Sequence, residues 1–511
     1  MNTLRLLKTQ YIIAGAFIFF LFSGCLSMTI KETFAGEIYY VAPGGNDKTG
    51  DGSIGRPWAT LKKANSVVTA GDTVYCRGGL YPDHRVTWTA VGREGNPITI
   101  AAYPGETPKF EGSIKTPTFL LVDTSVDVGS LIFDGLSMRF YNVGLLLRRG
   151  GDFIIRNCTF RDIAANTAGA IKTGMRGYIV RNLTIENCYF DNIGRLSEVA
   201  NDHSFYPSGK HKKIIVRNNY FKDSYGGPAL NMVAGTSFDI YNNVFYSTKG
   251  VGRQAIYVAG TPSTREAFNI CNNTFVIDPG GKGTTSWAIS TRWWGGRQED
   301  ITIKNNIFYY TATKTDPVYT NYSKPNPIMD NNMYYNTTDR HSDKDDDDTS
   351  VNSFVGNPLF VNAGNGDFKL NRNSPAIDKG SFIGSPEDDY YGNPRPYGFS
   401  CDIGAFEASF SLSNSGNKSV SRGRSVTNTI TSTLVSGTKR SISYSVTGLP
   451  PGAEYSFSPD ISTPTLSSDS PTTLKISTSF SSTTPKGNYT ITVLGTTGET
   501  TKRTSFVLTV M

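Results

Sequence analysis

Between positions 172 and 257, the chain carries four side chains suited to proton transfer or to charge neutralisation: Lys172, His203, Tyr206 and Arg253. Lys, His and Tyr act as general bases when their pKa is suitable, and a basic side chain stabilises negative charge that develops in a transition state. Such a set suits β-elimination on a sugar acid. In that reaction a base removes the proton beside a carboxylate while a cation neutralises the carboxylate.

A second group in the same region is suited to holding a ligand: Asp202, Asn231, Tyr257, Arg292, Trp293 and Trp294. The two Trp lie on a Gly-rich stretch, where their rings could stack on sugars. Each of these residues also has a plain structural interpretation, because outward-facing Tyr and Lys side chains on a sheet often only pack against cross-strand neighbours.

The elements that would position these residues come from an internal repeat. Its copies, such as Arg-Asn-Cys-Thr-Phe and Lys-Asn-Asn-Ile-Phe, place a marker Asn or Asp at 134, 157, 187, 218, 242, 272, 305 and 331, 23 to 33 residues apart. Short alternating segments such as 214–217 precede each marker, as in strands with one buried face. Constant chemistry at variable spacing predicts coils with loops of variable length, and the marker Asn residues are predicted to form an Asn ladder and turns.

A second aligned segment lies between the markers. If its central apolar residue points inward, the next residue points outward, which gives the column Leu146, Lys172, Tyr206, Asn231, Tyr257, Ser290 and Tyr319. Asp202 and Arg253 are predicted on the same face, whereas alternation turns His203 inward. Parallel strands would place successive column members roughly 4.8 Å apart. The sequence therefore predicts a ligand groove along the coils.

The N-terminal part, residues 38–113, contains Ile-Tyr-Tyr-Val-Ala-Pro-Gly-Gly-Asn-Asp and one helix candidate, 60–68, which Thr60 can cap and which has Leu61, Ala64, Val67 and Val68 on one face. This arrangement resembles the N-terminal region of secreted right-handed parallel β-helix proteins, including family 9 pectate lyases. The resemblance implies that fold, a calcium ion held by clustered aspartates, and a lysine base. The aspartate-rich motif is not found in this sequence. No metal ligands are therefore predicted, the cofactor is unknown with calcium one option, and Lys172 is a candidate by position alone.

The first 24 residues have the layout of a secretory signal, with Arg5 and Lys8 before the apolar run 11–22. The sequence around Cys25 resembles a bacterial lipobox, so Cys25 is a candidate lipid anchor, and cleavage after Ala35 is the alternative. The protein is expected to be exported, as a surface lipoprotein or in secreted form. Cys158 and Cys188 hold equivalent places in consecutive repeats and could form a disulfide bond.

The closing region of the solenoid runs to Glu407, and beyond it Ser and Thr alternate with apolar residues over about 100 residues. We therefore expect a signal peptide at 1–24, an all-β right-handed parallel β-helix with its caps at 36–407, and a small β-sandwich at 408–511 that resembles bacterial immunoglobulin-like modules.

The expected function is a lyase that cleaves an acidic, uronate-containing polysaccharide by β-elimination. The formal charge of +7 is compatible with an acidic polysaccharide as partner. Nucleic acid is not expected as a partner, a membrane is expected only through Cys25, and the protein is expected to be a monomer. One alternative is a non-catalytic glycan-binding or adhesin-like surface protein. The other is a β-helix glycoside hydrolase that uses Asp162 and Asp223, two coils and roughly 9.6 Å apart.

Overall fold

A computed structural model describes residues 36–511, apart from 114–117, 124–128, 165–168, 175–178, 196–201, 209–210, 234–236, 249–254, 261–267, 280–286, 294–300, 315–316, 322–326, 338–349, 383, 436–439, 466, 481–483 and 499. The predicted signal segment and Cys25 lie outside the described residues. Among the described residues, no helix is long and apolar enough to cross a membrane.

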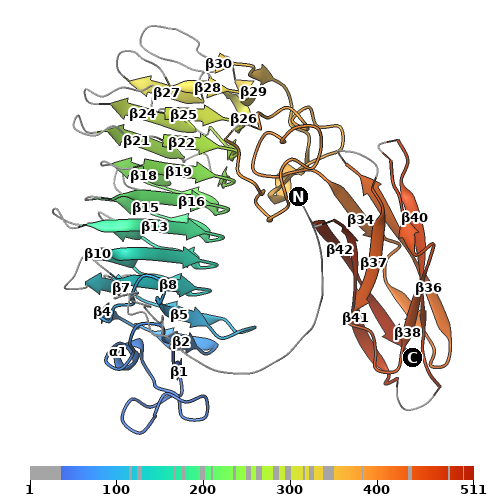
Figure 1. Cartoon of the computed structure of the whole chain (residues 1–511), viewed down its shortest axis with the longest axis horizontal. Helices are drawn as coiled ribbons and strands as arrows, with labels where there is room; N and C mark the ends of the chain where they lie inside the picture. The colour runs from blue at the N-terminus through green and yellow to red at the C-terminus, as the bar shows by residue number, and fades with distance from the viewer. Residues whose placement is uncertain are drawn as a thin grey trace, which may run out of the picture. The chain divides into compact units, whose positions relative to one another are not determined.

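Three parallel sheets form a β-helix, and each complete coil passes through them in order (Figure 1). The first sheet contains β4 (Val86–Trp88), β7 (Thr118–Asp123), the start of β10 (Val143–Arg156), β12 (Gly169–Thr173), β15 (His203–Pro207), β18 (Leu230–Val233), β21 (Ile256–Gly260), β24 (Ile289–Trp293) and β27 (Val318–Asn321). The second contains β1 (Ile38–Val41), β2 (Thr73–Cys76), β5 (Ile98–Ala102), β8 (Ser130–Asp134), the end of β10, β13 (Val180–Glu186), β16 (Lys213–Arg217), β19 (Ser237–Tyr241), β22 (Phe268–Cys271), β25 (Ile301–Lys304), β28 (Ile328–Asp330) and β30 (Ser350–Val351). The third contains β3 (Gly79–Pro82), β6 (Pro108–Glu111), β9 (Ser137–Arg139), β11 (Thr159–Arg161), β14 (Tyr189–Ile193), β17 (Tyr220–Ser224), β20 (Val244–Ser247), β23 (Thr274–Ile277), β26 (Ile307–Lys314), β29 (Met333–Thr337) and β31 (Phe354–Val355).

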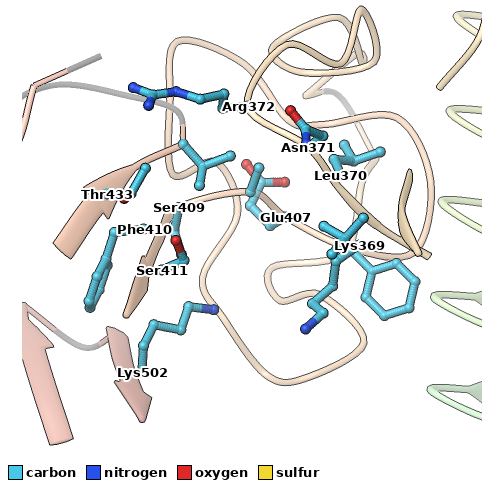
Figure 2. A pocket seen from close by; sticks show the side chains of 14 residues that line it. Lys369, Leu370, Asn371, Arg372, Glu407, Ser409, Phe410, Ser411, Thr433 and Lys502 are labelled. Atoms are coloured by element: carbon cyan, nitrogen blue, oxygen red, sulfur yellow. The ribbon is translucent and has the colours of Figure 1, made fainter. Parts of the chain in front are cut away.

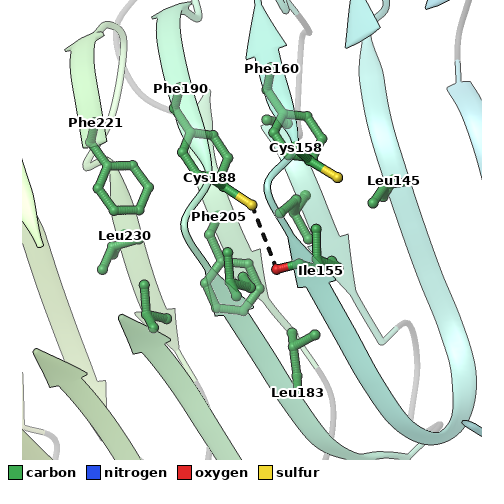
Figure 3. Close-up of a cluster of buried hydrophobic side chains, with 14 of the residues drawn as sticks. Leu145, Ile155, Cys158, Phe160, Leu183, Cys188, Phe190, Phe205, Phe221 and Leu230 are labelled. Carbon is green, nitrogen blue, oxygen red and sulfur yellow. Dashed lines mark hydrogen bonds between the residues drawn. The ribbon is translucent and has the colours of Figure 1, made fainter. Parts of the chain in front are cut away.

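The interior is filled by equivalent residues stacked from coil to coil. The Phe of the repeat motif lines the third sheet, and its rings stack with centroid separations of 4.6 to 5.2 Å from Phe160 through Phe190, Phe221, Phe245, Phe275 and Phe308 to Tyr334. Figure 3 shows three of these rings next to the buried Leu and Ile side chains of the other sheets. One core therefore runs the length of the solenoid, as the period-two pattern predicted.

From β10 onward, a two-residue turn joins the second sheet to the third in each coil, and its two positions have different roles. The first residue, the predicted marker, adopts a left-handed backbone, with φ of 56° at Asn218 and 54° at Asn242, a conformation that Asn tolerates better than most residues. The second residue is buried and builds the ladder: the amide nitrogen of Asn243 donates to Oδ1 of Asn273 at 3.0 Å, and that of Asn273 donates to Oδ1 of Asn306 at 3.1 Å. The predicted turn role of the markers is confirmed, but the ladder is formed by the residue after each marker.

In the earlier coils, cysteines hold the ladder position. Cys158 and Cys188 are buried free thiols, so the disulfide bond considered from the sequence is not formed. The thiol of Cys188 contacts the carbonyl of Ile155 at 3.6 Å (Figure 3), and its backbone N–H donates to Oδ1 of Asn219 at 2.9 Å. A thiol thus occupies the place that an amide occupies in later coils.

The helix α1 (Leu61–Asn65) lies at the N-terminal end of the β-helix. Oγ1 of Thr60 accepts from the N–H of Lys63 at 3.1 Å, which confirms the predicted cap. Leu61 and Ala64 are fully buried, but the helix is shorter than predicted. Beyond its end, Val68 is buried as predicted, whereas Val67 is exposed.

A capping segment, residues 378–407, runs along the marker asparagines, following the hairpin of β32 (Phe360–Asn362) and β33 (Asp367–Leu370) with the short 3-10 helix Ala363–Asn365 between its strands. The side-chain amides of Asn242 and Asn331 donate to the carbonyls of Asp388 and Lys379 at 2.8 and 2.9 Å. Within the segment, Arg395 and Glu407 form a fully buried ion pair at 2.7 Å. The first Asn of each pair therefore binds the cap, while the second binds the neighbouring coil.

The C-terminal strands form two facing antiparallel-rich sheets, which confirms the predicted β-sandwich. One sheet contains β34 (Phe410–Asn414), β36 (Ser425–Leu434), β40 (Ser470–Ser477) and β38 (Glu454–Ser458). The other contains β35 (Lys418–Val420), β42 (Thr500–Val510), β41 (Gly487–Thr497), β37 (Ile442–Thr447) and β39 (Ile461–Ser462). A cavity of about 300 Å³, shown in Figure 2, is lined by residues of the capping region and of the sandwich, Phe410 and Lys502 among them.

Replacing a ladder amide should destabilise the β-helix. We expect Asn243→Leu to lower the free energy of unfolding by at least about 3 kcal/mol, because buried polar groups at Val216, Asn219 and Asn273 lose their partners. Urea denaturation followed by circular dichroism measures the change. Asn269→Leu is the matched control, because Asn269 is exposed, and its effect should stay within about 0.5 kcal/mol. Equal losses in the two variants would contradict a stabilising ladder.

Candidate functional site

The predicted column lies in register on the first sheet. Backbone pairing aligns each column member with the next: Leu146 with Lys172, Lys172 with Tyr206, Asn231 with Tyr257, Tyr257 with Ser290, and Ser290 with Tyr319. Tyr206 and Asn231 are in the same register, because the residues before them, Phe205 and Leu230, pair with each other. The residue before each column member is buried, from Leu145 and Ile171 to Val318. The register and the buried position before each column member are as predicted, but alternation does not extend one residue further, because Ala170, Ser204 and Ala288 are buried as well.

Lys172 and Tyr206 form the centre of this column. The Lys172 ammonium lies 5.3 Å from the centroid of the Tyr206 ring, within the range of a cation–π contact. Partial burial lowers the pKa of Lys172 below its ordinary value of 10.5, because a desolvated ammonium is less stable than a neutral amine. A lysine in such a place is better able to accept a proton near neutral pH than a solvated one.

His203 lies beneath this pair, with only 3% of its surface exposed. Its ring stacks on Tyr206 with centroids 5.3 Å apart. Nδ1 lies 2.9 Å from the carbonyl oxygen of Pro228, and Nε2 lies 2.8 Å from the side-chain nitrogen of Asn231. Burial lowers the pKa of His203 to about 4, and the Lys172 ammonium acts in the same direction. His203 is buried, but its ring contacts Tyr206 and Asn231 of the outward column, so it does not point into the core as alternation predicted. Both ring nitrogens are engaged in hydrogen bonds.

Asp202 does not lie on the outward face, contrary to the prediction from alternation. It precedes β15, is 2% exposed, and forms an ion pair with Nε of Arg195 at 3.3 Å. The loop before the strand does not follow the period of the strand, so the carboxylate is buried, and its charge is balanced by the partly exposed Arg195. Ser204, also buried, shares a hydrogen bond with Ser224 at 2.8 Å.

Farther along the column, Ser290 is 2% exposed, whereas Tyr257 and Tyr319 are partly exposed. The ring of Tyr319 stacks on Trp287 with centroids 4.1 Å apart and planes 7° from parallel. The sequence analysis did not single out Trp287. Trp287 directly precedes the aligned segment that begins at Ala288, and this position in the sequence was the signal that could have identified it. This aromatic pair provides a flat surface suited to a sugar ring.

Several predicted residues cannot be placed. Arg253 and Trp294 lie outside the described residues. Arg292 and Trp293 belong to β24, where their backbones pair with Ala259 and Gly260.

The two carboxylates of the hydrolase alternative have structural partners. Asp162 binds Arg139 at 2.7 Å and has a positive φ, and Asp223 is buried and accepts hydrogen bonds from Thr248. In the described part of the chain, no three His, Cys, Asp or Glu side chains gather as metal ligands. The described residues therefore do not fit the aspartate-held calcium of family 9 pectate lyases, and no step is derived through that ion.

Three cavities among the described residues lie away from the column. One is the cavity of Figure 2, a second, of about 570 Å³, is on the outer face of the second sheet between Tyr241, Lys304 and the capping segment at Asp388, and a third, of about 150 Å³, is lined by residues that include Arg93 and Asp152. None is lined by a column residue. The column remains the candidate site because it brings the lysine and tyrosine suited to proton transfer into contact.

Comparison with known proteins locates the resemblance in the N-terminal half. Residues 39–223, which include Lys172, His203 and Tyr206, match the family model described as Pel9A-like, right handed beta helix region. A pectate lyase, PEL9, of Emericella nidulans is 35% identical over 89 residues, which is 17% of this chain and 22% of that enzyme. The chain thus spans about a fifth of the length of that relative.

Solved structures matched to this chain include an alginate lyase from Paenibacillus sp. str. FPU-7, with a TM-score of 0.43 and 17% identity over 58% of this chain and 96% of that one. A PL6 family polysaccharide lyase from Pseudopedobacter saltans has a TM-score of 0.37 and 15% identity over 55% of this chain and 75% of that one. With the parallel coils described above and the family model, residues 39–223 are a right-handed parallel β-helix region similar to that of Pel9A-like proteins.

Proposed function

We propose that this protein is an exported polysaccharide lyase that cleaves a uronate-containing polysaccharide by β-elimination on the outer face of the first sheet. The observation that carries the proposal is the alignment of Lys172 with Tyr206, at a strand spacing of about 4.8 Å, with the Lys172 pKa lowered by burial. The similarity to a pectate lyase supports the same class of reaction. Export is supported by the layout of the first 24 residues.

In the proposed reaction, the neutral amine of Lys172 takes the proton from the carbon beside the uronate carboxylate. The electrons of that C–H bond form a C=C bond as the bond from the neighbouring carbon to the glycosidic oxygen breaks. The departing oxygen receives a proton from the Tyr206 hydroxyl or from water, and Arg253 is the candidate for neutralising the carboxylate. This assignment leaves His203 outside proton transfer, because both of its nitrogens are engaged.

A non-catalytic glycan-binding protein is the second candidate, and the stacked pair of Trp287 and Tyr319 favours it. Aromatic surfaces bind sugars without chemistry, so this role predicts binding without cleavage. It is the alternative outcome of the test that follows.

Residues 25–511, the chain without the predicted signal segment, should release unsaturated products from polygalacturonate or alginate. We expect Lys172→Ala to lower kcat about 10²- to 10⁴-fold, the usual contribution of a general base. Ultraviolet absorbance of the new C=C bond measures the rate, and Lys213→Ala, an exposed lysine on the second sheet, is the matched control. If the unsubstituted protein produces no absorbance change on any polymer, and binding survives in Lys172→Ala as well as in Lys213→Ala, the lyase is ruled out. Reducing ends without absorbance would indicate a hydrolase.

The rate should also depend on pH in a defined direction. Lys172 acts as a base only when neutral, so kcat/KM should rise with pH through a pKa that lies below the ordinary lysine value of 10.5. Initial rates measured across the neutral and alkaline range test this. A profile that falls over that range would show that a protonated Lys172, or another group, is required.

A further inference from the structure

The hydrogen bonds of His203 define which of its nitrogens carries the proton. A carbonyl oxygen only accepts, so Nδ1, 2.9 Å from the oxygen of Pro228, carries a hydrogen. The pKa of about 4 keeps the ring neutral at ordinary pH, so Nε2 has a lone pair and accepts from the group 2.8 Å away on Asn231. Only the NH₂ group of that side chain can donate. The orientation of the Asn231 carboxamide therefore follows from the neutral ring.

The imidazole packs directly against the backbone of the next coil. A side chain at Gly227 would come within 2.5 Å of Cε1 of His203, so glycine leaves room there for the ring. One coil earlier, a side chain at Gly169 would meet the backbone carbonyl of His203. Tyr206 covers one face of the ring.

Asn231 is consequently held with its nitrogen turned toward His203. Its Oδ1 is buried and has no hydrogen-bond partner among the described residues. A buried acceptor without a partner is unfavourable, and a donor that reaches it restores the lost hydrogen bond. Asn231 as a whole is only partly buried and belongs to the outward column next to Tyr257, so a ligand that binds along the column and reaches this oxygen can supply that donor.

We infer that His203 is a positioning residue that presents the Asn231 oxygen to bound sugar, so that this position accepts a hydrogen bond from a sugar hydroxyl and does not bind the uronate carboxylate. The inference rests on the proposed function for the class of ligand. It orients the sugar, because the hydroxyl-bearing edge faces Asn231 and the carboxylate, which an amide oxygen repels, faces another part of the column.

The first test compares a free ligand with one whose hydroxyls are blocked. Calorimetry gives Kd for an oligogalacturonate and for its O-acetylated form, all in a Lys172→Ala background so that nothing is cleaved. Acetylation should weaken binding about tenfold more when Asn231 is present than in Asn231→Leu, the effect of one lost hydrogen bond. Equal effects of acetylation with and without Asn231 would overturn the inference. The inference would also be overturned if Asn231→Leu weakened binding of the free acid but not of a ligand whose carboxylates are esterified.

The second test separates positioning from a purely structural role. His203→Phe retains an aromatic ring against Tyr206 but cannot accept from Asn231. It should abolish the discrimination against acetylated ligand, with no further loss in the double variant with Asn231→Leu. His84→Phe, which removes a histidine near the N-terminal helix, is the control and should retain the discrimination. Retained discrimination in His203→Phe would overturn the positioning role.

A third measurement needs no ligand. Nitrogen NMR of the His203 ring at pH 7 should show the neutral form protonated at Nδ1, and either an imidazolium or the other tautomer would overturn the inference. If the ring has this form and the acetyl discrimination is found but no polymer is cleaved, the lyase proposal fails and the inference stands. Cleavage without discrimination sinks the inference alone, and absence of binding by any uronate oligomer overturns both.

Discussion

The register between successive coils is the constraint on which the rest of this structure depends. Parallel pairing sets neighbouring strands about 4.8 Å apart, and a slip of one residue would exchange the inward and outward faces of a strand. Here the ladder of Asn219, Asn243, Asn273, Asn306 and Asn332 holds that register, because each of these side-chain amides hydrogen-bonds to a neighbouring coil. Lys172 and Tyr206 pair in the same register on the first sheet, in the coils just before the amide ladder begins at Asn219.

The paired asparagines also explain how a solenoid made of coils of unequal length acquires a continuous cap. The ladder residue needs a buried amide with donors and acceptors in two directions, whereas the residue before it needs a left-handed backbone and a free amide. Asn meets both requirements, and so it recurs twice in succession from Asn218 onward. In earlier coils the ladder position holds Cys158 and Cys188. Their thiols contact a carbonyl of the preceding coil, as the later amides do, but they form no side-chain ladder, which begins only at Asn219. The capping segment binds the left-handed asparagines of the later coils, where paired asparagines occur.

The sequence predicted the coils, the inward core and the outward column, because a period of two depends only on local alternation and is repeated in every coil. It did not predict which Asn of each pair forms the ladder, because the two are equivalent in composition and differ only in backbone conformation. It placed Asp202 outward because alternation was extended past the start of β15 at His203. Burial and ion pairing determine the position of such a loop residue, and neither is visible in the spacing. The pair of Trp287 and Tyr319 was missed for a similar reason, since one partner lies just outside an aligned segment.

The arrangement around His203 shows how a repetitive scaffold can hold one irregular group. A regular coil would place a small residue there, as Gly169 does one coil earlier, and the large ring fits only because Gly227 leaves room for it in the next coil. Burial without charge requires that both ring nitrogens have partners. Pro228 supplies an acceptor, and its own nitrogen cannot donate, so the carbonyl is the only backbone polar group it offers. The remaining nitrogen therefore has to be satisfied from the column itself, which links a buried packing requirement to the orientation of Asn231 at the surface where sugar would bind.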